Sequence, residues 1–121
     1  MHETSIAASI LETAQGLIRE QGEGRLESVK VAVGELSAVE PDLLVFAWEA
    51  LISGTSTPDA ALEIEWSPAQ TYCPTCNRNL DRARGSWLRL CSKCGDPVVT
   101  KGGDELDIVQ ISFIQEDSNQ P

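Results

Sequence analysis

The spacing of apolar residues changes from helical to alternating within the first third of the chain. In residues 4–21 apolar side chains recur every three or four positions, which predicts an amphipathic helix that Gly22 and Gly24 end. In residues 26–33 valine alternates with polar or small side chains, which predicts a strand with one strongly apolar face. The apolar positions of these two elements are Ile6, Ile10, Ala14, Leu17, Ile18, Val29, Val31 and Val33.

A second helix and a second strand follow in the same order. Pro41 is well placed as a first helical residue, and the Ser-Gly-Thr sequence at residues 53–55 ends the helix. In residues 62–66 apolar side chains alternate with Glu63 and Glu65, which predicts a strand. The expected buried stripe of the helix is Leu43, Leu44, Ala47 and Leu51, broadened by Phe46, Trp48 and Ile52.

A third strand is predicted in residues 106–114, after two consecutive glycines. Its apolar residues occupy both odd and even positions instead of strictly alternating. Either a β-bulge or burial of both faces of the strand would explain this pattern. One parity carries Val109, Ile111 and Phe113, and the other carries Leu106 and Ile108.

The four cysteines of the chain form two CxxC pairs that are separated by fourteen residues. Each CxxC turn directs two thiolates to one side, so two such turns can complete a tetrahedral site of the kind that Zn²⁺ accepts. Four protein ligands leave no open coordination position, so we expect a structural Zn²⁺. Two disulfides or free core thiols are the alternatives. The predicted ligands are Cys73, Cys76, Cys91 and Cys94.

Together these elements predict an α/β (α+β) fold, with a small mixed three-stranded sheet, two helices and an inserted zinc-ribbon module. The first two strands flank a helix, so we expect them to be parallel with a right-handed connection, and the last strand to pair with them. We expect an α/β domain in residues 1–69 and 102–117, the zinc ribbon in residues 70–101, and a flexible tail in residues 118–121.

The distribution of charge narrows the classes of function. The 121 residues carry a net charge of −10, but residues 73–94 hold five basic side chains against Asp81, a formal +4 that leaves −14 for the remainder. A strongly acidic protein is repelled by phosphate backbones, which argues against general nucleic-acid binding. The alternative function is a zinc-ribbon module that binds nucleic acid or takes part in transcription, in which Trp87 stacks on a base. A basic face that contacts an acidic protein is the other interpretation of this charge.

Other features of the sequence point away from a membrane protein and from an enzyme. We find no apolar run long enough to span a bilayer and no signal peptide, so we expect a cytoplasmic protein whose thiols stay reduced. His2 is the only histidine, and the predicted zinc site is closed, so no nucleophile–base pair based on histidine is available within the chain.

The N-terminus offers a compact set of nitrogen donors. The Met1 amine, the backbone nitrogens of His2 and Glu3, and the His2 imidazole lie within one tripeptide. Nitrogen donors in a square-planar or tetragonal set suit Ni(II) or Cu(II). The alternative is that a histidine stands at this position by chance. Glu40 is a further candidate, as an oxygen ligand that approaches the N-terminus from the start of the second helix; its alternative is a solvated loop acid.

Several segments of the sequence resemble the HypA/HybF family of nickel-insertion proteins for [NiFe]-hydrogenase maturation. The resemblance covers nearly the whole chain in matching order. The segments that carry it are Met-His-Glu at residues 1–3, Val-Gly-Glu-Leu-Ser-Ala-Val at 33–39, Pro-Asp at 41–42, Phe-Ala at 46–47, Gly-Thr at 54–55, Gly-Asp-Glu-Leu at 103–106, and both CxxC pairs.

The resemblance implies a nickel site at the N-terminus, a separate structural zinc in the ribbon, and no catalytic activity. The nickel role falls on His2, on the backbone nitrogens of His2 and Glu3, and on the Met1 amine. The family delivers Ni(II) to the hydrogenase large subunit together with the GTPase HypB, and some members also serve urease. A homodimer is a further expectation, because a small sheet has exposed strand edges.

Overall fold

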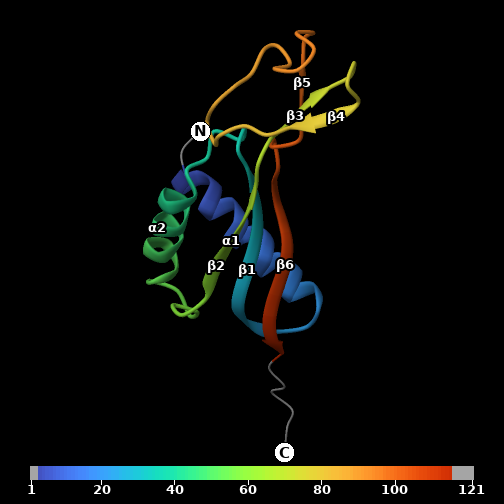
Figure 1. Ribbon diagram of the computed structural model, residues 1–121. Coiled ribbons are helices and arrows are strands. Elements are labelled where there is room, and N and C mark those ends of the chain that lie inside the picture. Colours follow the sequence, from blue (N-terminus) through green and yellow to red (C-terminus); the bar gives the residue numbers. More distant parts are fainter. Residues whose placement is uncertain (1–2, 116–121) are drawn as a thin grey trace, which may run out of the picture.

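Two three-stranded sheets and two helices make up residues 3–115, the part of the chain that this computed structural model describes (Figure 1). The predictions for Met1, His2 and the tail at residues 118–121 lie outside the described residues. The elements in chain order are α1 (Glu3–Glu20), β1 (Gly24–Gly34), α2 (Pro41–Ile52), β2 (Ala61–Ser67), β3 (Gln70–Cys73), β4 (Arg78–Leu80), β5 (Val99–Lys101) and β6 (Leu106–Gln115).

The main sheet has the strand order β2-β1-β6. Strand β1 pairs in parallel with β2 and antiparallel with β6, which confirms the predicted mixed three-stranded sheet. Val29, Val31 and Val33 of β1 are buried in one core with apolar side chains from both helices, so α1 and α2 cover the same face of this sheet. No helix within residues 3–115 is both long and apolar enough to cross a membrane.

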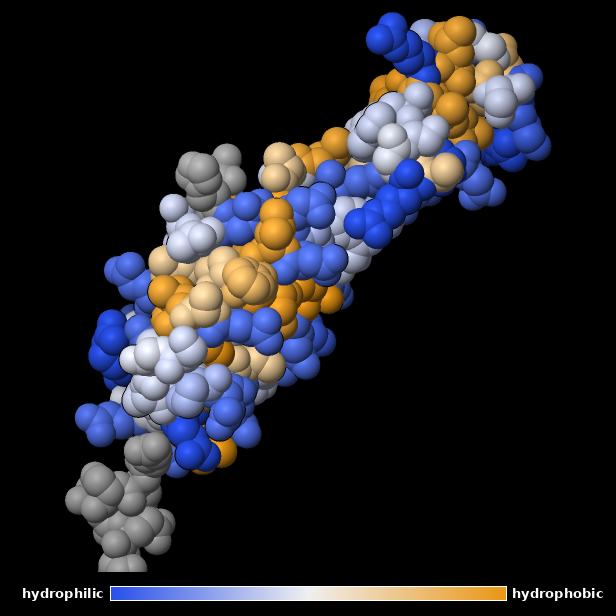
Figure 2. Space-filling view, turned by 90° about the vertical axis from the view of Figure 1, so that its left-hand side faces the viewer, coloured by the Kyte–Doolittle hydropathy of each residue, from blue (hydrophilic) through white to orange (hydrophobic). Residues whose placement is uncertain are grey.

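The buried stripe of α2 differs from the predicted one. Leu44 and Trp48 are fully buried, and the Trp48 Nε1–H donates a hydrogen bond to the Ala60 carbonyl oxygen at 2.9 Å. Ala47 and Ile52 are also buried as predicted, but Leu43 is 54% exposed and Phe46 is 70% exposed, so the buried face of the helix is narrower than the predicted one. Figure 2, which faces α2, shows apolar side chains among polar ones on this surface. Leu17, one of the apolar positions that predicted α1, is exposed as well.

A β-bulge explains the two parities of β6. Ile108 pairs with Val31, but Gln110 pairs with Lys30, so Val109 is one residue too many for its partner strand. The extra residue brings Leu106 and Ile108 to the same core face as Ile111 and Phe113. Val109 does not share that face and is 48% exposed, so the grouping of Val109 with Ile111 and Phe113 is wrong.

The second sheet was not predicted from the sequence, and the first CxxC pair lies at the end of its strand β3 and in the turn that leads to β4. Its order is β4-β3-β5, and both pairings are antiparallel. Figure 1 shows it beyond the end of the main sheet where β1 finishes, β6 begins and α1 starts. The connections between the two sheets therefore lie close to the N-terminal end of α1.

Candidate functional site

The four cysteines come together at one end of the second sheet. Their Sγ atoms all lie within 4.8 Å of one another, with 3.5 Å from Cys73 to Cys94 and 3.9 Å from Cys76 to Cys91. A tetrahedral site with Zn–S bonds of about 2.3 Å places its sulfurs roughly 3.8 Å apart. The donor set and its spacing therefore fit a tetrahedral metal ion such as Zn²⁺. All four residues are free thiols, so the alternative of two disulfides is not what the structure contains.

The two CxxC turns are built alike. The residue that follows each pair has a positive φ, 55° at Asn77 and 81° at Gly95, a conformation that asparagine and glycine adopt at low cost. Backbone N–H groups point at the sulfurs: that of Cys76 donates to Cys73 Sγ and that of Lys93 to Cys91 Sγ, each at 3.3 Å. These donors favour thiolates, the form that binds a metal ion.

The surroundings of the sulfurs change the pKa values of the cysteines in opposite directions. The backbone N–H groups of Cys94 and Lys93 lower the pKa of Cys91 to about 6. Hydrogen bonds with the sulfurs of Cys94 and Cys73 raise the pKa of Cys76 to about 12, and repulsion by the charge of Cys73 adds to this effect. A bound cation would offset this repulsion and allow all four thiolates to exist together.

The start of α1 lies against the start of α2. Glu3 is the first residue of α1, and its carboxylate accepts a hydrogen bond from the Glu40 backbone N–H at 3.4 Å. The structure thus brings together two of the predicted nickel-site residues, Glu3 and Glu40. Met1 and His2, which supply the other donors, lie outside the described residues.

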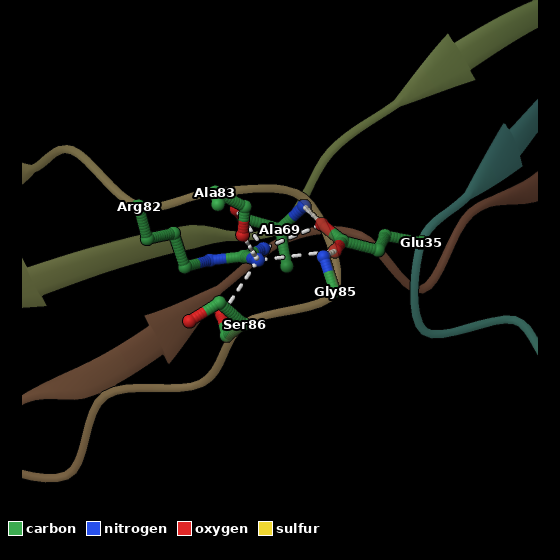
Figure 3. A network of polar contacts seen from close by, with 6 residues as sticks. All are labelled: Glu35, Ala69, Arg82, Ala83, Gly85 and Ser86. Carbon is green, nitrogen blue, oxygen red and sulfur yellow. Dashed lines mark hydrogen bonds and ion pairs between the residues drawn. The ribbon is translucent and has the colours of Figure 1, made fainter.

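Sequence reasoning missed a buried ion pair that joins the two sheets. Glu35 follows β1, Arg82 follows β4, and each side chain is only 6% exposed. Figure 3 shows the two side chains reaching toward each other across the junction, the place where the end of β1 meets the connections between the two sheets. Glu35 accepts from Arg82 Nη1 at 3.0 Å and Nη2 at 2.5 Å, and from the backbone N–H groups of Gly85 at 2.9 Å and Ala69 at 3.0 Å.

These donors strongly favour the charged form of Glu35. The Arg82 guanidinium, with the Gly85 N–H, lowers the pKa of Glu35 from 4.5 to about 2. Glu35 in turn raises the pKa of Arg82. Arg82 also donates to the carbonyl oxygens of Ala69 at 2.7 Å and Ser86 at 2.9 Å, so one guanidinium holds both the strand-to-strand connection and the loop that follows β4.

Close backbone packing reinforces the same junction. A Cβ atom on Gly34 would lie 2.1 Å from the Gly103 carbonyl oxygen, and one on Gly103 would lie 2.7 Å from the Ala69 Cβ. Leu36 N–H donates to that Gly103 oxygen at 2.5 Å, and Gly34 N–H donates to the Glu105 oxygen at 2.7 Å. The two connections between the sheets are therefore held tightly against the end of β1.

The junction also reduces the case for a nucleic-acid-binding ribbon. The charge of Arg82 is paired with Glu35, and its guanidinium lies over the Trp87 ring at 4.3 Å. Arg84 lies over the Trp66 ring at 4.1 Å. Trp87 and two of the five basic residues within residues 73–94 are thus already engaged within the protein.

Comparison with known proteins agrees with this architecture. The family described as "Hydrogenase/urease nickel incorporation, metallochaperone, hypA" matches residues 1–113. The hydrogenase maturation factor HypA of Rhizobium leguminosarum bv. viciae is 36% identical over 115 residues, covering 94% of this chain and 100% of the relative. That of Roseiflexus sp. (strain RS-1) is 34% identical over 116 residues, covering 93% of this chain and 92% of the relative.

Solved structures share the fold. The solution structure of a HypA protein superimposes with a TM-score of 0.64 at 25% identity, covering 96% of this chain and 98% of the other. The solution structure of the Ni metallochaperone HypA from Helicobacter pylori gives a TM-score of 0.63 at 24% identity, covering 96% and 100%. The sequence match over nearly the whole length, together with the shared fold, places this chain in the HypA family of metallochaperones for hydrogenase and urease nickel incorporation.

Proposed function

We propose that this protein binds Ni(II) at its N-terminus and helps to insert it into the large subunit of a [NiFe]-hydrogenase. The observation that carries the proposal is the family match over residues 1–113, which includes the N-terminal tripeptide. The proposed donors are the Met1 amine, the His2 imidazole and the backbone nitrogens of His2 and Glu3, with Glu40 as an additional oxygen ligand.

The position of Glu3 supports a role for its backbone nitrogen. The first N–H groups of a helix have no carbonyl oxygen four residues earlier to bind, so the Glu3 nitrogen is not consumed by α1. Its carboxylate is directed toward Glu40, whose N–H it accepts. The side chain of Glu3 then anchors the tripeptide while the backbone supplies the ligand.

The chemistry of the two donor sets supports a division between cargo and structural metal. Selectivity among divalent metals comes from ligand type and geometry more than from affinity, and a planar nitrogen set suits Ni(II) better than Zn²⁺. Amide nitrogens must lose a proton to bind, and imidazole must be neutral. The affinity for nickel should therefore fall as the pH drops toward the pKa of histidine.

We assign the four-cysteine cluster to a structural Zn²⁺ that contributes the folding energy of residues 70–101. The sulfur spacing supports this assignment, and the span agrees with a sheet that begins with Gln70 and ends with Lys101. Residues 1–69 and 102–117 would form the nickel-binding domain, and residues 118–121 a flexible tail.

The proposed role requires partners rather than catalysis. We infer that the protein acts in the cytoplasm with a HypB-type GTPase and the hydrogenase large subunit, and that a homodimer forms through strand edges or exchanged elements. Neither nucleic acid nor a membrane takes part.

The proposal is tested by titrating Ni(II) into the zinc-loaded protein by calorimetry and absorbance. A matched protein carries two extra residues before Met1, which remove the terminal amine from the chelate. We expect the native protein to bind one nickel ion and the extended protein to lose that site while its zinc content stays the same. Equal nickel binding by both proteins would exclude the amine as a ligand, and a His2→Ala variant would then test the imidazole.

A further inference from the structure

The second sheet has one buried face and one exposed face. Thr71 and Cys73 of β3 and Leu80 of β4 are buried on the side of the cysteine cluster. The residues that alternate with them lie on the opposite side, because successive side chains of a strand point to opposite faces of a sheet. The strand pairings place five residues side by side on this opposite side, here called the outer face: Gln70, Tyr72, Asn79, Val99 and Lys101.

Exposed aliphatic side chains lie on the outer face and beside it. Val99 is directly opposite Tyr72 in the sheet and is 43% exposed. Leu90 pairs with Pro97, two residues before Val99, and is 57% exposed. Figure 2 shows apolar side chains next to strongly hydrophilic ones at the end of the molecule that holds the second sheet. Burying these aliphatic side chains against an apolar group of a partner is favourable.

The charge around the outer face is positive. Lys101 lies on the face itself, with its Nζ 3.8 Å from the centre of the Tyr72 ring. Exposed arginines stand one residue before Asn79 and one residue before Leu90. Residues 70–101 hold six basic side chains against two acidic ones, within a chain whose net charge is −10. This part of the protein therefore differs in sign from the rest.

Most of this positive charge is not neutralised within the fold. Among residues 3–115, Arg82 is the only one of the six basic residues that forms an ion pair with a carboxylate. Asp96, one of the two acidic residues, accepts a hydrogen bond from the Thr75 hydroxyl at 2.7 Å. A zinc ion with four thiolates would itself be anionic, but Cys73 is buried on the other side of the sheet. The outer face is therefore complementary to negative charge.

We propose that the outer face, together with Leu90 beside it, is a docking surface for an acidic segment of another protein. The carboxylates of that segment face Lys101 and the neighbouring arginines, and one of its apolar side chains packs on Val99 and Leu90. Charge complementarity determines the choice of this occupant. The inference goes beyond the proposed function, because this surface requires neither nickel nor the N-terminal tripeptide.

A nucleic acid fits the outer face less well than an acidic protein segment does. Base stacking requires an open aromatic ring, but Lys101 covers one side of the Tyr72 ring. Leu90 and Val99 offer aliphatic surface, which suits the apolar side chains of a protein. A long phosphate backbone is also repelled by the acidic remainder of the chain, whereas a short segment contacts the basic part alone.

The test adds three probes to the full-length, zinc-loaded, isotope-labelled protein. One is a short synthetic peptide of glutamate and leucine, the second is a peptide of equal length and charge in which serine replaces leucine, and the third is a short single-stranded DNA. Chemical shifts of the backbone amides locate the binding site by NMR. Fluorescence anisotropy of the labelled probes measures their affinities.

We expect the glutamate–leucine peptide to shift the amides of Tyr72, Val99 and Lys101 and to leave Val29 of β1 unchanged. The serine peptide should bind about tenfold more weakly, because it lacks the apolar contact. Added salt should weaken both peptides. Binding of the DNA but not of the peptides would assign the surface to nucleic acid and overturn the proposal. Shifts at these residues when the protein alone is concentrated would make a second copy the occupant, which also overturns it.

Substitutions test the surface itself. Lys101→Gln should weaken the glutamate–leucine peptide about threefold, and Leu90→Ser about fivefold, with the zinc content unchanged because neither residue is a ligand. The matched control is Lys30→Gln, the same change in β1 of the main sheet, which should bind as wild type does. If Lys101→Gln and Lys30→Gln weaken binding equally, the peptide responds to net charge rather than to the outer face, and the proposal is wrong.

Discussion

Replacing Gly34 by alanine adds one methyl group where the end of β1 meets the connection into β6. The new Cβ would lie 2.1 Å from the Gly103 oxygen and 2.6 Å from the Glu105 nitrogen. Ordinary carbon contacts lie at about 3.5–4.0 Å, so the backbone around Gly103 must move by more than about 1 Å. That movement breaks the hydrogen bonds from Leu36 to Gly103 and from Gly34 to Glu105.

The expected loss of stability follows from these contacts. Overpacking costs about 1–3 kcal/mol, and each broken hydrogen bond adds about 1 kcal/mol, so Gly34→Ala should lose about 4 kcal/mol. Urea unfolding followed by circular dichroism should show the midpoint lowered by about 2 M at a slope of about 2 kcal/mol/M. Gly54→Ala is the control, because nothing lies within 4 Å of its added Cβ. Equal midpoints for the two variants would refute the close packing at this junction.

Three further changes probe the core, the ion pair and the cysteine cluster. Trp48→Phe removes a buried hydrogen bond and should cost about 2 kcal/mol in thermal unfolding, whereas the exposed Trp87→Phe should cost little. The pKa of Glu35 is lowered from 4.5 to about 2, so its ion pair stabilises the fold fully above pH 4.5. This stabilisation is lost as the pH falls from 4.5 toward 2. Glu35→Gln should therefore flatten the pH dependence of the free energy of unfolding between pH 4.5 and 2. Cys76→Ser should remove zinc, measured by atomic absorption, while the helical circular dichroism signal stays; full zinc retention would contradict the four-sulfur site.

The elements that periodicity predicts are those with an extended apolar face. The strand predicted at residues 62–66 is β2, Ala61–Ser67, because alternation over several residues reports burial on one side directly. The strands of the second sheet have three or four residues and mostly polar exposed positions, so no such pattern marks them. The cysteine spacing indicated a folded module there, but not its sheet.

The candidate site was predictable where ligands are close in sequence or share a motif. The two CxxC pairs do meet, as their spacing led us to expect. The Glu40 backbone N–H donates to the Glu3 carboxylate, and the role of the Glu40 side chain as a nickel ligand stays a prediction. The Glu35–Arg82 pair joins residues 47 apart and depends on how two sheets are placed, which local patterns do not encode. Its only signal was a basic segment within an acidic chain. The nickel roles of Met1 and His2 stay predictions.

Transfer of nickel to a hydrogenase large subunit that lacks it tests the central claim most directly. The protein, loaded with one equivalent of radioactive nickel, is mixed with the purified large subunit in the presence of a chelator that removes free nickel. We predict that the native protein transfers its nickel, whereas His2→Ala and the protein with two added N-terminal residues do not, although all three retain zinc. Equal transfer by all three proteins would contradict delivery from an N-terminal nickel site.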